Sequence, residues 1–225
     1  YNVSKKLMEK VSIPVPPLPV QSEIVRILDN FTELTAELTA ELTAELTARK
    51  KQYEYYRNHL FEFKTDKVRC MLLDDVIVSL NTGLNPRQFF SLNTDDARNY
   101  YVTIRDLQKN RVVVSDKTDR MNDEAMRLCN NRSNLEIGDV LFSGTGTIGE
   151  TAIIEETPTD WNIKEGVYSI KPNHDLIVSR FLMYMLKSDK IRTQYMKKAA
   201  GGTVKSVPMG DMRKLIIPVP PLEEQ

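Results

Sequence analysis

Leucine recurs at every fourth position between residues 33 and 48, where the unit Glu-Leu-Thr-Ala occurs four times in succession. Ala, Leu and Glu strongly favour an α-helix, and neither Gly nor Pro interrupts the run. Each unit advances a helix by about 6 Å and about 400°, so successive leucines form an apolar stripe that shifts by only about 40° per unit. The pattern predicts a rigid helical spacer whose length can change in steps.

The apolar stripe continues on both sides of the repeats at three- and four-residue spacing. We predict one helix from about Pro19 to about Phe61, roughly 64 Å long at about 1.5 Å per residue. So long a stripe favours a coiled-coil partner; the alternative is a single amphipathic helix lying on a globular domain. The predicted helix–helix contacts are Ile24, Leu28, Phe31, Leu34, Leu38, Leu42, Leu46, Tyr53, Tyr56 and Leu60.

Between about Lys64 and Gly210 the pattern changes to short β-rich runs separated by turns. Two longer helices are predicted near the end of this part, at residues 176–186 and 189–199, and a shorter one at residues 123–128. The predicted strands are residues 76–80, 100–104, 111–114, 140–143, 151–154 and 167–170. The expected fold is therefore α/β in the α+β sense: a mixed α/β domain with a modest core, attached to a long coiled-coil-forming helix.

A proline-rich motif occurs twice, 204 positions apart: residues 13–18 and residues 217–222 both have the sequence Ile-Pro-Val-Pro-Pro-Leu. A residue before Pro avoids the helical region, whereas Pro is well tolerated in the first helical turn, so the motif is typical of an extended segment leading into a helix. We expect a piece of a longer chain with four parts. These are a Pro-rich segment ending a preceding unit (1–18), the spacer helix (19–63), a globular domain (64–213) and a second Pro-rich copy starting a truncated helix (214–225).

Composition sets few limits on function. The 225 residues have zero formal net charge, so any nucleic-acid-binding surface must be local. Cys70 and Cys129 are too few for a disulfide framework or a zinc site. A cytoplasmic protein without membrane association is expected, because we find neither a signal peptide nor an apolar run near 18 residues.

Residues 144–149 form the string Gly-Thr-Gly-Thr-Ile-Gly, which matches the dinucleotide-binding fingerprint and follows a predicted strand. The fingerprint also requires a helix beginning at its third glycine, whereas residues 150–154 have the composition of a strand. We therefore expect a turn between strands, with the hydroxyls of Thr145 and Thr147 exposed. Such a turn could be purely structural or could approach a DNA phosphate backbone.

The chain is locally basic between residues 187 and 214, around a Gly201-Gly202 turn. The usual explanation of such a run is a solvated helix face; the functional alternative is contact with DNA phosphates around a flexible loop. The candidates here are Lys197, Lys198, Thr203 and Lys205. A second basic group consists of Arg105, Lys109 and Arg111, and Arg87 could recognise a base edge.

No catalytic or metal-binding constellation is evident. His59 and His174 are isolated from cysteines and from carboxylates at ligand spacing. The sequence contains no P-loop, no nucleophile motif and no amino-methyltransferase tetrad. We predict no catalytic residue, no metal site and no cofactor site in this chain.

The two proline-rich motifs, each running into residues such as Gln21-Ser22-Glu23 or Glu223-Glu224-Gln225, resemble the conserved regions of specificity (S) subunits of type I restriction–modification enzymes. The tandem four-residue spacer is similar to that of the type IC branch. Shorter motifs at residues 73–76, 101–104, 138–143, 146–149 and 202–203 resemble a target recognition domain of that family. The resemblance covers the whole chain, with one recognition domain rather than the family's two.

The resemblance implies a non-catalytic subunit that binds double-stranded DNA. Its globular domain would recognise one half of a split target, and its long helix would set the spacing and bind methyltransferase (M) subunits. S-adenosylmethionine, ATP and Mg would belong to partner subunits, including the restriction (R) subunit, which this chain would contact only indirectly. Self-association through the long helix is a further possibility. Two alternatives remain: a coiled-coil scaffold that binds protein, and an enzyme acting at residues 144–149.

Overall fold

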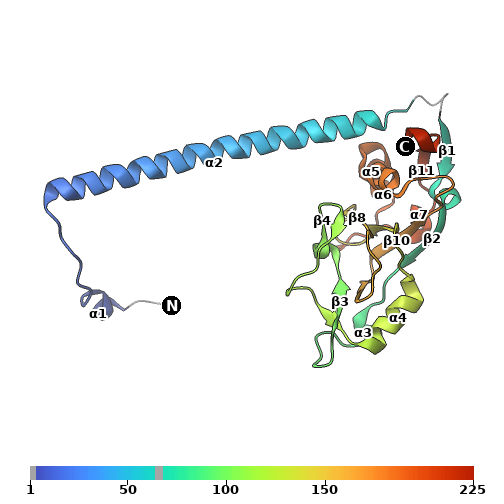
Figure 1. Cartoon of the computed structure of the whole chain (residues 1–225), viewed down its shortest axis with the longest axis horizontal. Helices are drawn as coiled ribbons and strands as arrows, with labels where there is room; N and C mark the ends of the chain where they lie inside the picture. The colour runs from blue at the N-terminus through green and yellow to red at the C-terminus, as the bar shows by residue number, and fades with distance from the viewer. Residues whose placement is uncertain (1–3, 64–67) are drawn as a thin grey trace. The chain divides into compact units, whose positions relative to one another are not determined.

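A computed structural model describes residues 4–63 and 68–225. Contacts divide the chain into a helical unit, residues 1–55, and a globular unit, residues 56–225 (Figure 1). The predicted boundary between helix and globular domain is at residues 63 and 64. The predicted first residue of the globular domain, residue 64, is one of residues 64–67, which lie outside the described residues.

The four-residue repeats lie in α2 (Leu18–Leu60), one unbroken helix that begins and ends one residue earlier than predicted (Figure 1). Pro19 lies in its first turn, where a missing backbone N–H costs no helical hydrogen bond. The side-chain amide of Gln21 donates to the carbonyl oxygen of Pro16 at 2.7 Å, next to the start of the helix. A short helix, α1 (Lys5–Met8), precedes this segment.

The threonines of the repeats form their hydrogen bonds within the helix. Thr35, Thr39, Thr43 and Thr47 each donate to the backbone carbonyl four residues earlier, at 2.6–2.8 Å. These hydroxyls therefore need no polar partner on another helix, which makes the threonine positions compatible with an apolar contact.

The ten predicted helix–helix contact residues are all exposed in the single chain, from 45% for Ile24 to 72% for Leu60. A continuous exposed apolar row of this kind is typical of a surface that binds a partner. The pairing itself stays a prediction.

The central sheet of the globular unit is antiparallel, with strand order β2–β10–β7–β8. Its middle strands, β7 and β10, are buried along almost their whole length; β7 appears in the sequence as a short apolar run, whereas β10 also includes Ser169 and Lys171. In the order of the sheet, the strands are β2 (Ile77–Thr82), β10 (Val167–Pro172), β7 (Val140–Ser143) and β8 (Thr151–Ile153).

Three smaller sheets complete the β-structure of the described residues. One is three-stranded, in the order β6 (Arg120–Met121), β3 (Asn99–Val102) and β9 (Trp161–Ile163). In this sheet, β9 is parallel to β3. The others are two-stranded and antiparallel: β1–β11 (Arg69–Leu72 with Ile216–Val219) and β4–β5 (Leu107–Gln108 with Arg111–Val112).

Helices flank these sheets, and asparagines cap two of them. Asn85 accepts a hydrogen bond from the backbone N–H of Arg87, and Asn122 accepts one from that of Ala125. The α-helices are α3 (Pro86–Phe89), α4 (Asp123–Ser133), α5 (Ser179–Lys187), α6 (Asp189–Lys198) and α7 (Met209–Met212). The 3₁₀ turns are η1 (Leu73–Val76), η2 (Ile104–Asp106) and η3 (Leu222–Glu224).

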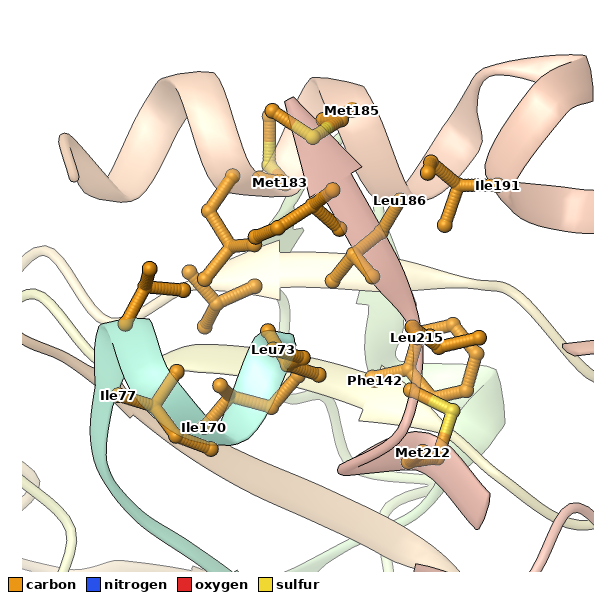
Figure 2. Close-up of a cluster of buried hydrophobic side chains, with 14 of the residues drawn as sticks. Leu73, Ile77, Phe142, Ile170, Met183, Met185, Leu186, Ile191, Met212 and Leu215 are labelled. Atoms are coloured by element: carbon orange, nitrogen blue, oxygen red, sulfur yellow. The ribbon is translucent and has the colours of Figure 1, made fainter. Parts of the chain in front are cut away.

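The largest hydrophobic cluster joins the central sheet to α5, α6, α7 and η1. Figure 2 shows Leu73, Phe142, Ile170, Leu186 and Leu215 among the side chains that converge there from different elements. All five are at most 2% exposed. The core thus places β7, β10 and α6, and with them the loops that follow β7 and α6.

The predicted strands at residues 140–143 and 167–170 and the predicted helix at residues 189–199 are confirmed. Strand β9 was not predicted, because three residues after a proline-containing turn carry no periodic signal. The mixed α/β class is confirmed as well, with one long helix and a domain of helices and sheets.

Residues 214–225 were predicted to be an extended segment that leads into a second helix. Ile216–Val219 is extended, as strand β11 paired with β1 in the globular unit, and the second helix stays a prediction. Ile217 is fully buried in the main core. This Pro-rich copy is therefore a structural part of the globular domain, because it supplies the strand that pairs with β1.

Candidate nucleic-acid interface

Residues 144–149, here called the glycine loop, connect the antiparallel strands β7 and β8. Strand β8 follows the loop, so the third glycine does not begin a helix that could hold a pyrophosphate. This confirms the predicted turn between strands and argues against the dinucleotide fingerprint. Thr147 is exposed, and Thr145 is half-buried.

A second loop, residues 199–206, lies directly beside the glycine loop; we call it the lysine loop. The Gly146 N–H donates to the Lys205 carbonyl oxygen at 2.9 Å, and the Val207 N–H donates to the Gly144 carbonyl oxygen at 2.8 Å. Ala200 and Ser206 exchange two backbone hydrogen bonds that close the second loop on itself. Two segments about sixty positions apart thereby form one surface.

The paired loops bring together most of the residues that were predicted to contact DNA. Lys197 and Lys198 end α6 and lead into the lysine loop. The residues assembled in this way are Thr145, Thr147, Lys197, Lys198, Thr203 and Lys205, of which all but Thr145 are exposed. Hydroxyls, backbone amides and three lysines on one exposed surface are the groups that contact DNA phosphates.

A concavity of about 510 Å³ adjoins the glycine loop through Thr145. Arg87 and Arg105, both predicted from the sequence, line it as well, together with Lys164. Asp119 lies 3.7 Å from the Arg105 guanidinium, so part of that positive charge is balanced. The concavity offers both hydrogen-bond donors and acceptors, which is the mixture that recognition of base edges requires.

Lys109 and Arg111 line a different concavity, on the β4–β5 hairpin. Lys109 and Asn110 both have positive φ, 50° and 66°, as a tight two-residue hairpin turn requires. The Arg111 guanidinium lies 3.0 Å from Glu155, which also pairs with Arg180 at 2.7 Å. The structure therefore does not place Arg105, Lys109 and Arg111 in one group.

Lys187 anchors this hairpin. Its ammonium group donates to the Asn110 side-chain oxygen at 2.5 Å. Burial lowers the pKa of Lys187, while the nearby Glu150 carboxylate raises it. Because Lys187 is half-buried and engaged in this contact, it belongs to the support of the hairpin rather than to an exposed basic surface.

Three aromatic side chains lie in the core beneath the two loops. The Phe142 ring stacks on Tyr168 with centroids 6.4 Å apart and meets Tyr195 edge-on at 5.2 Å. Burial raises the pKa of Tyr195 to about 12, and it also raises the pKa of Tyr168. An ordinary phenol, with a pKa of about 10, is already protonated at neutral pH, and burial extends this to higher pH, so both side chains can donate a hydrogen bond.

Sequence reasoning missed Lys164, Asp119 and the two tyrosines. Lys164 follows the short strand β9, which carries no signal of its own, and Asp119 precedes the two-residue strand β6. Only the tyrosines had a detectable signal: Tyr168 lies within a predicted strand, and Tyr195 lies at an inward position of a predicted helix.

Some classes of site are absent from the part of the chain that the structure describes. No cluster of three or more His, Cys, Asp or Glu side chains there could hold a metal ion. Across residues 4–63 and 68–225, no helix is both long and apolar enough to span a membrane.

Comparison with known proteins gives a consistent result. The family described as "Type I restriction modification DNA specificity domain" matches residues 1–48 and 71–225. A putative type I restriction enzyme specificity subunit of Haemophilus influenzae, S.HindORF215P, is 32% identical over all of this chain and 55% of its own length. The EcoR124I/EcoR124II specificity subunit of Escherichia coli is 30% identical over 99% of this chain and 54% of its own length.

A solved structure concerning complex assembly and conformational transition of the type I R-M system has a similar fold. Its chain superposes with a TM-score of 0.63 at 19% identity, covering 94% of this chain and 50% of that chain. At this identity the match concerns the fold alone. The present chain spans about half the length of the curated relatives that it matches.

Proposed function

Because the chain belongs to the family of type I restriction–modification DNA specificity domains, we propose that it is a DNA-recognition part of such a complex. The globular unit recognises one half of a split target in double-stranded DNA. Helix α2 sets the distance between the half-sites and binds methyltransferase subunits. The chain is the non-catalytic specificity component, and it works in the cytoplasm.

One observation carries this proposal: the globular unit collects donors for phosphate and base contacts on neighbouring surfaces. The paired loops supply lysines and threonine hydroxyls, and the adjoining concavity supplies Arg87, Arg105 and Lys164. Phosphate contacts fix a protein on DNA, whereas base-edge contacts in a groove supply the specificity. A domain with both kinds of group side by side suits the recognition of a short half-site.

The chemistry of the complex is assigned to other subunits. S-adenosylmethionine and methyl transfer belong to the methyltransferase subunits, while ATP, Mg and DNA cleavage belong to the restriction subunit. What this chain supplies is the position of the DNA target relative to those subunits.

The repeated motif supports a second globular domain of the same kind. Met8, Val11 and Ile13 are 64%, 64% and 71% exposed, whereas their counterparts Met212, Leu215 and Ile217 are 0%, 2% and 0% exposed. Gln21 and Gln225 donate to the carbonyl oxygens of Pro16 and Pro220, at 2.7 and 2.8 Å, so the same side-chain hydrogen bond closes the turn after the prolines in both copies. We propose that residues 1–18 end a preceding unit and pack on it as β11 packs here.

A binding experiment tests the proposed function. The chain, mixed with its methyltransferase partner, is titrated against a pool of randomised DNA duplexes at two salt concentrations. Enrichment of a motif of about three to five base pairs supports one recognition domain, and enrichment of a split palindrome supports two copies joined through α2. Uniform binding that falls steeply with salt would leave only phosphate contact, and absence of binding would favour the scaffold alternative.

A further inference from the structure

Tyr168 touches both loops of the candidate interface from below. Its hydroxyl donates to the Val207 carbonyl oxygen at 2.7 Å, at the end of the lysine loop. Its ring lies directly beneath Gly144, the first residue of the glycine loop, where a Cβ atom would overlap it. Burial raises the pKa of the Tyr168 phenol, and the nearby Thr145 hydroxyl partly offsets that rise.

The strand that carries Tyr168 is held firmly. It lies in β10, between β2 and β7, and its register partner on β7 is Phe142, against which its ring stacks. The side chain is only 6% exposed. Tyr168 therefore has a fixed position from which to hold two exposed loops.

We propose that Tyr168 is a positioning residue for DNA recognition, because its phenol and ring couple the glycine loop to the lysine loop. This inference rests on the proposed function. Without the coupling, the loops keep their lysines and threonines, but the angle and distance between these groups vary. Contact with phosphates tolerates such variation, since the Coulomb attraction changes slowly with distance. Base-edge hydrogen bonds do not tolerate it, because they weaken steeply away from ideal geometry.

The variant Tyr168→Phe tests the coupling, because it keeps the ring beneath Gly144 and removes only the hydroxyl. Its matched control is Tyr101→Phe, which removes another buried phenol that donates to a backbone carbonyl, that of Leu84 at 2.6 Å, in a separate hydrophobic cluster. Amide hydrogen exchange is measured on the full chain for both variants. Loss of one buried hydrogen bond predicts about tenfold faster exchange at Gly146 and Val207 in Tyr168→Phe.

In the control, the faster exchange should be confined to the surroundings of Leu84 and should not reach the two loops. Unchanged loop exchange in Tyr168→Phe would overturn the coupling. Equal loop exchange in both variants would overturn it too, since it would reflect a general loss of stability.

DNA binding supplies the second measurement. In the complex with the methyltransferase partner, Tyr168→Phe should reduce the ratio of specific to non-specific affinity by about tenfold, as expected for the loss of one well-formed base contact. Non-specific affinity and the salt slope should stay unchanged. An equal loss of specific and non-specific affinity would overturn the positioning role. If the unaltered chain binds no DNA, the proposed function fails, while the exchange experiment still decides whether Tyr168 couples the loops.

Discussion

At the scale of single residues, tight backbone contacts decide where a side chain is tolerated. Gly83 lies against the backbone of Ile163, so that a Cβ atom there would overlap the Ile163 carbonyl group. Gly202, by contrast, has open space around its Cβ position. Gly83 allows the chain at the end of β2 to pack closely against β9. Gly202 lies in an exposed loop, where another side chain can be accommodated.

Gly83→Ala should therefore lower the free energy of unfolding by about 3 kcal/mol, because neither backbone segment can move away without breaking sheet contacts. Gly202→Ala is the matched control and should change it by less than about 0.5 kcal/mol. Chemical denaturation of both variants, followed by circular dichroism, measures the difference. Equal stabilities would mean that the chain relaxes around Gly83 without cost.

Lys205 lies in the lysine loop, next to the glycine loop, and is exposed. Lys205→Gln should weaken DNA binding to a similar extent for all sequences and should reduce the salt slope by about 1, as expected for one lost phosphate contact. Titrations at several salt concentrations, with target and scrambled duplexes, measure both quantities.

Arg132→Gln removes an equal charge from an exposed position on α4 and serves as the control for Lys205→Gln. It should leave the slope unchanged. A selective loss of affinity for the target sequence in Lys205→Gln would contradict the assignment of Lys205 to phosphate.

At the scale of elements, the geometry of α2 explains how a four-residue unit can be added or removed. Eighteen residues make five helical turns, so Ile24, Leu42 and Leu60 point in the same direction. Four residues turn the helix by about 40° beyond one full turn, which keeps the apolar stripe on nearly the same face. Adding or removing one four-residue unit therefore changes the length of the helix, while the apolar residues at its two ends still face in nearly the same direction.

Deleting Thr39–Leu42 should shorten the distance between the recognised half-sites by one or two base pairs and leave the half-site bases unchanged. The physical reason is that one unit spans about 6 Å, against about 3.4 Å for one base-pair step. Selection from a randomised duplex pool, with the assembled complex, measures spacing and bases together. Altered half-site bases at unchanged spacing would contradict the ruler function.

Deleting only Thr39 and Ala40 is the matched control. This deletion shortens the helix by about 3 Å but rotates its two ends by about 200°. The apolar stripe is then broken between its two halves. Loss of assembly is expected in this variant, rather than a shorter spacing.

At the scale of the whole molecule, the exposed apolar stripe of α2 predicts a partner. Its large side chains are half to three-quarters exposed in the single chain, and its threonine hydroxyls are bonded within the helix. We propose a second long helix as the partner, which two copies of this chain can supply to each other. A symmetric pair would then present two identical globular units to DNA.

Sedimentation velocity at several protein concentrations tests this pairing. The unaltered chain should dimerise, and Leu42→Lys should weaken the association by at least about tenfold, because it would bury an unpaired charge. Glu41→Lys introduces the same side chain at the neighbouring polar position and should have a much smaller effect. A chain that stays monomeric at every concentration would mean that the partner helix is not a second copy.

Local patterns in the sequence determined the helical part and the class of the protein. Helix α2 was predicted to within one residue at each end, since helical hydrogen bonds join residues only four positions apart. The buried strands β7 and β10 were also predicted, because β7 is a short apolar run and β10 begins with residues that favour strands. The repeated Pro-rich motif and the four-residue units likewise pointed to the family that the comparisons identify.

Only the tertiary structure decided how the candidate site is assembled. Arg87, Arg105 and Lys164 line one concavity beside Thr145, whereas Lys109 and Arg111 lie at another. The second Pro-rich copy became strand β11 because β1, almost 150 positions earlier, offers it a partner. Such pairings depend on the closure of long loops and on a shared core, and neither leaves a periodic signal in the sequence near the residues concerned.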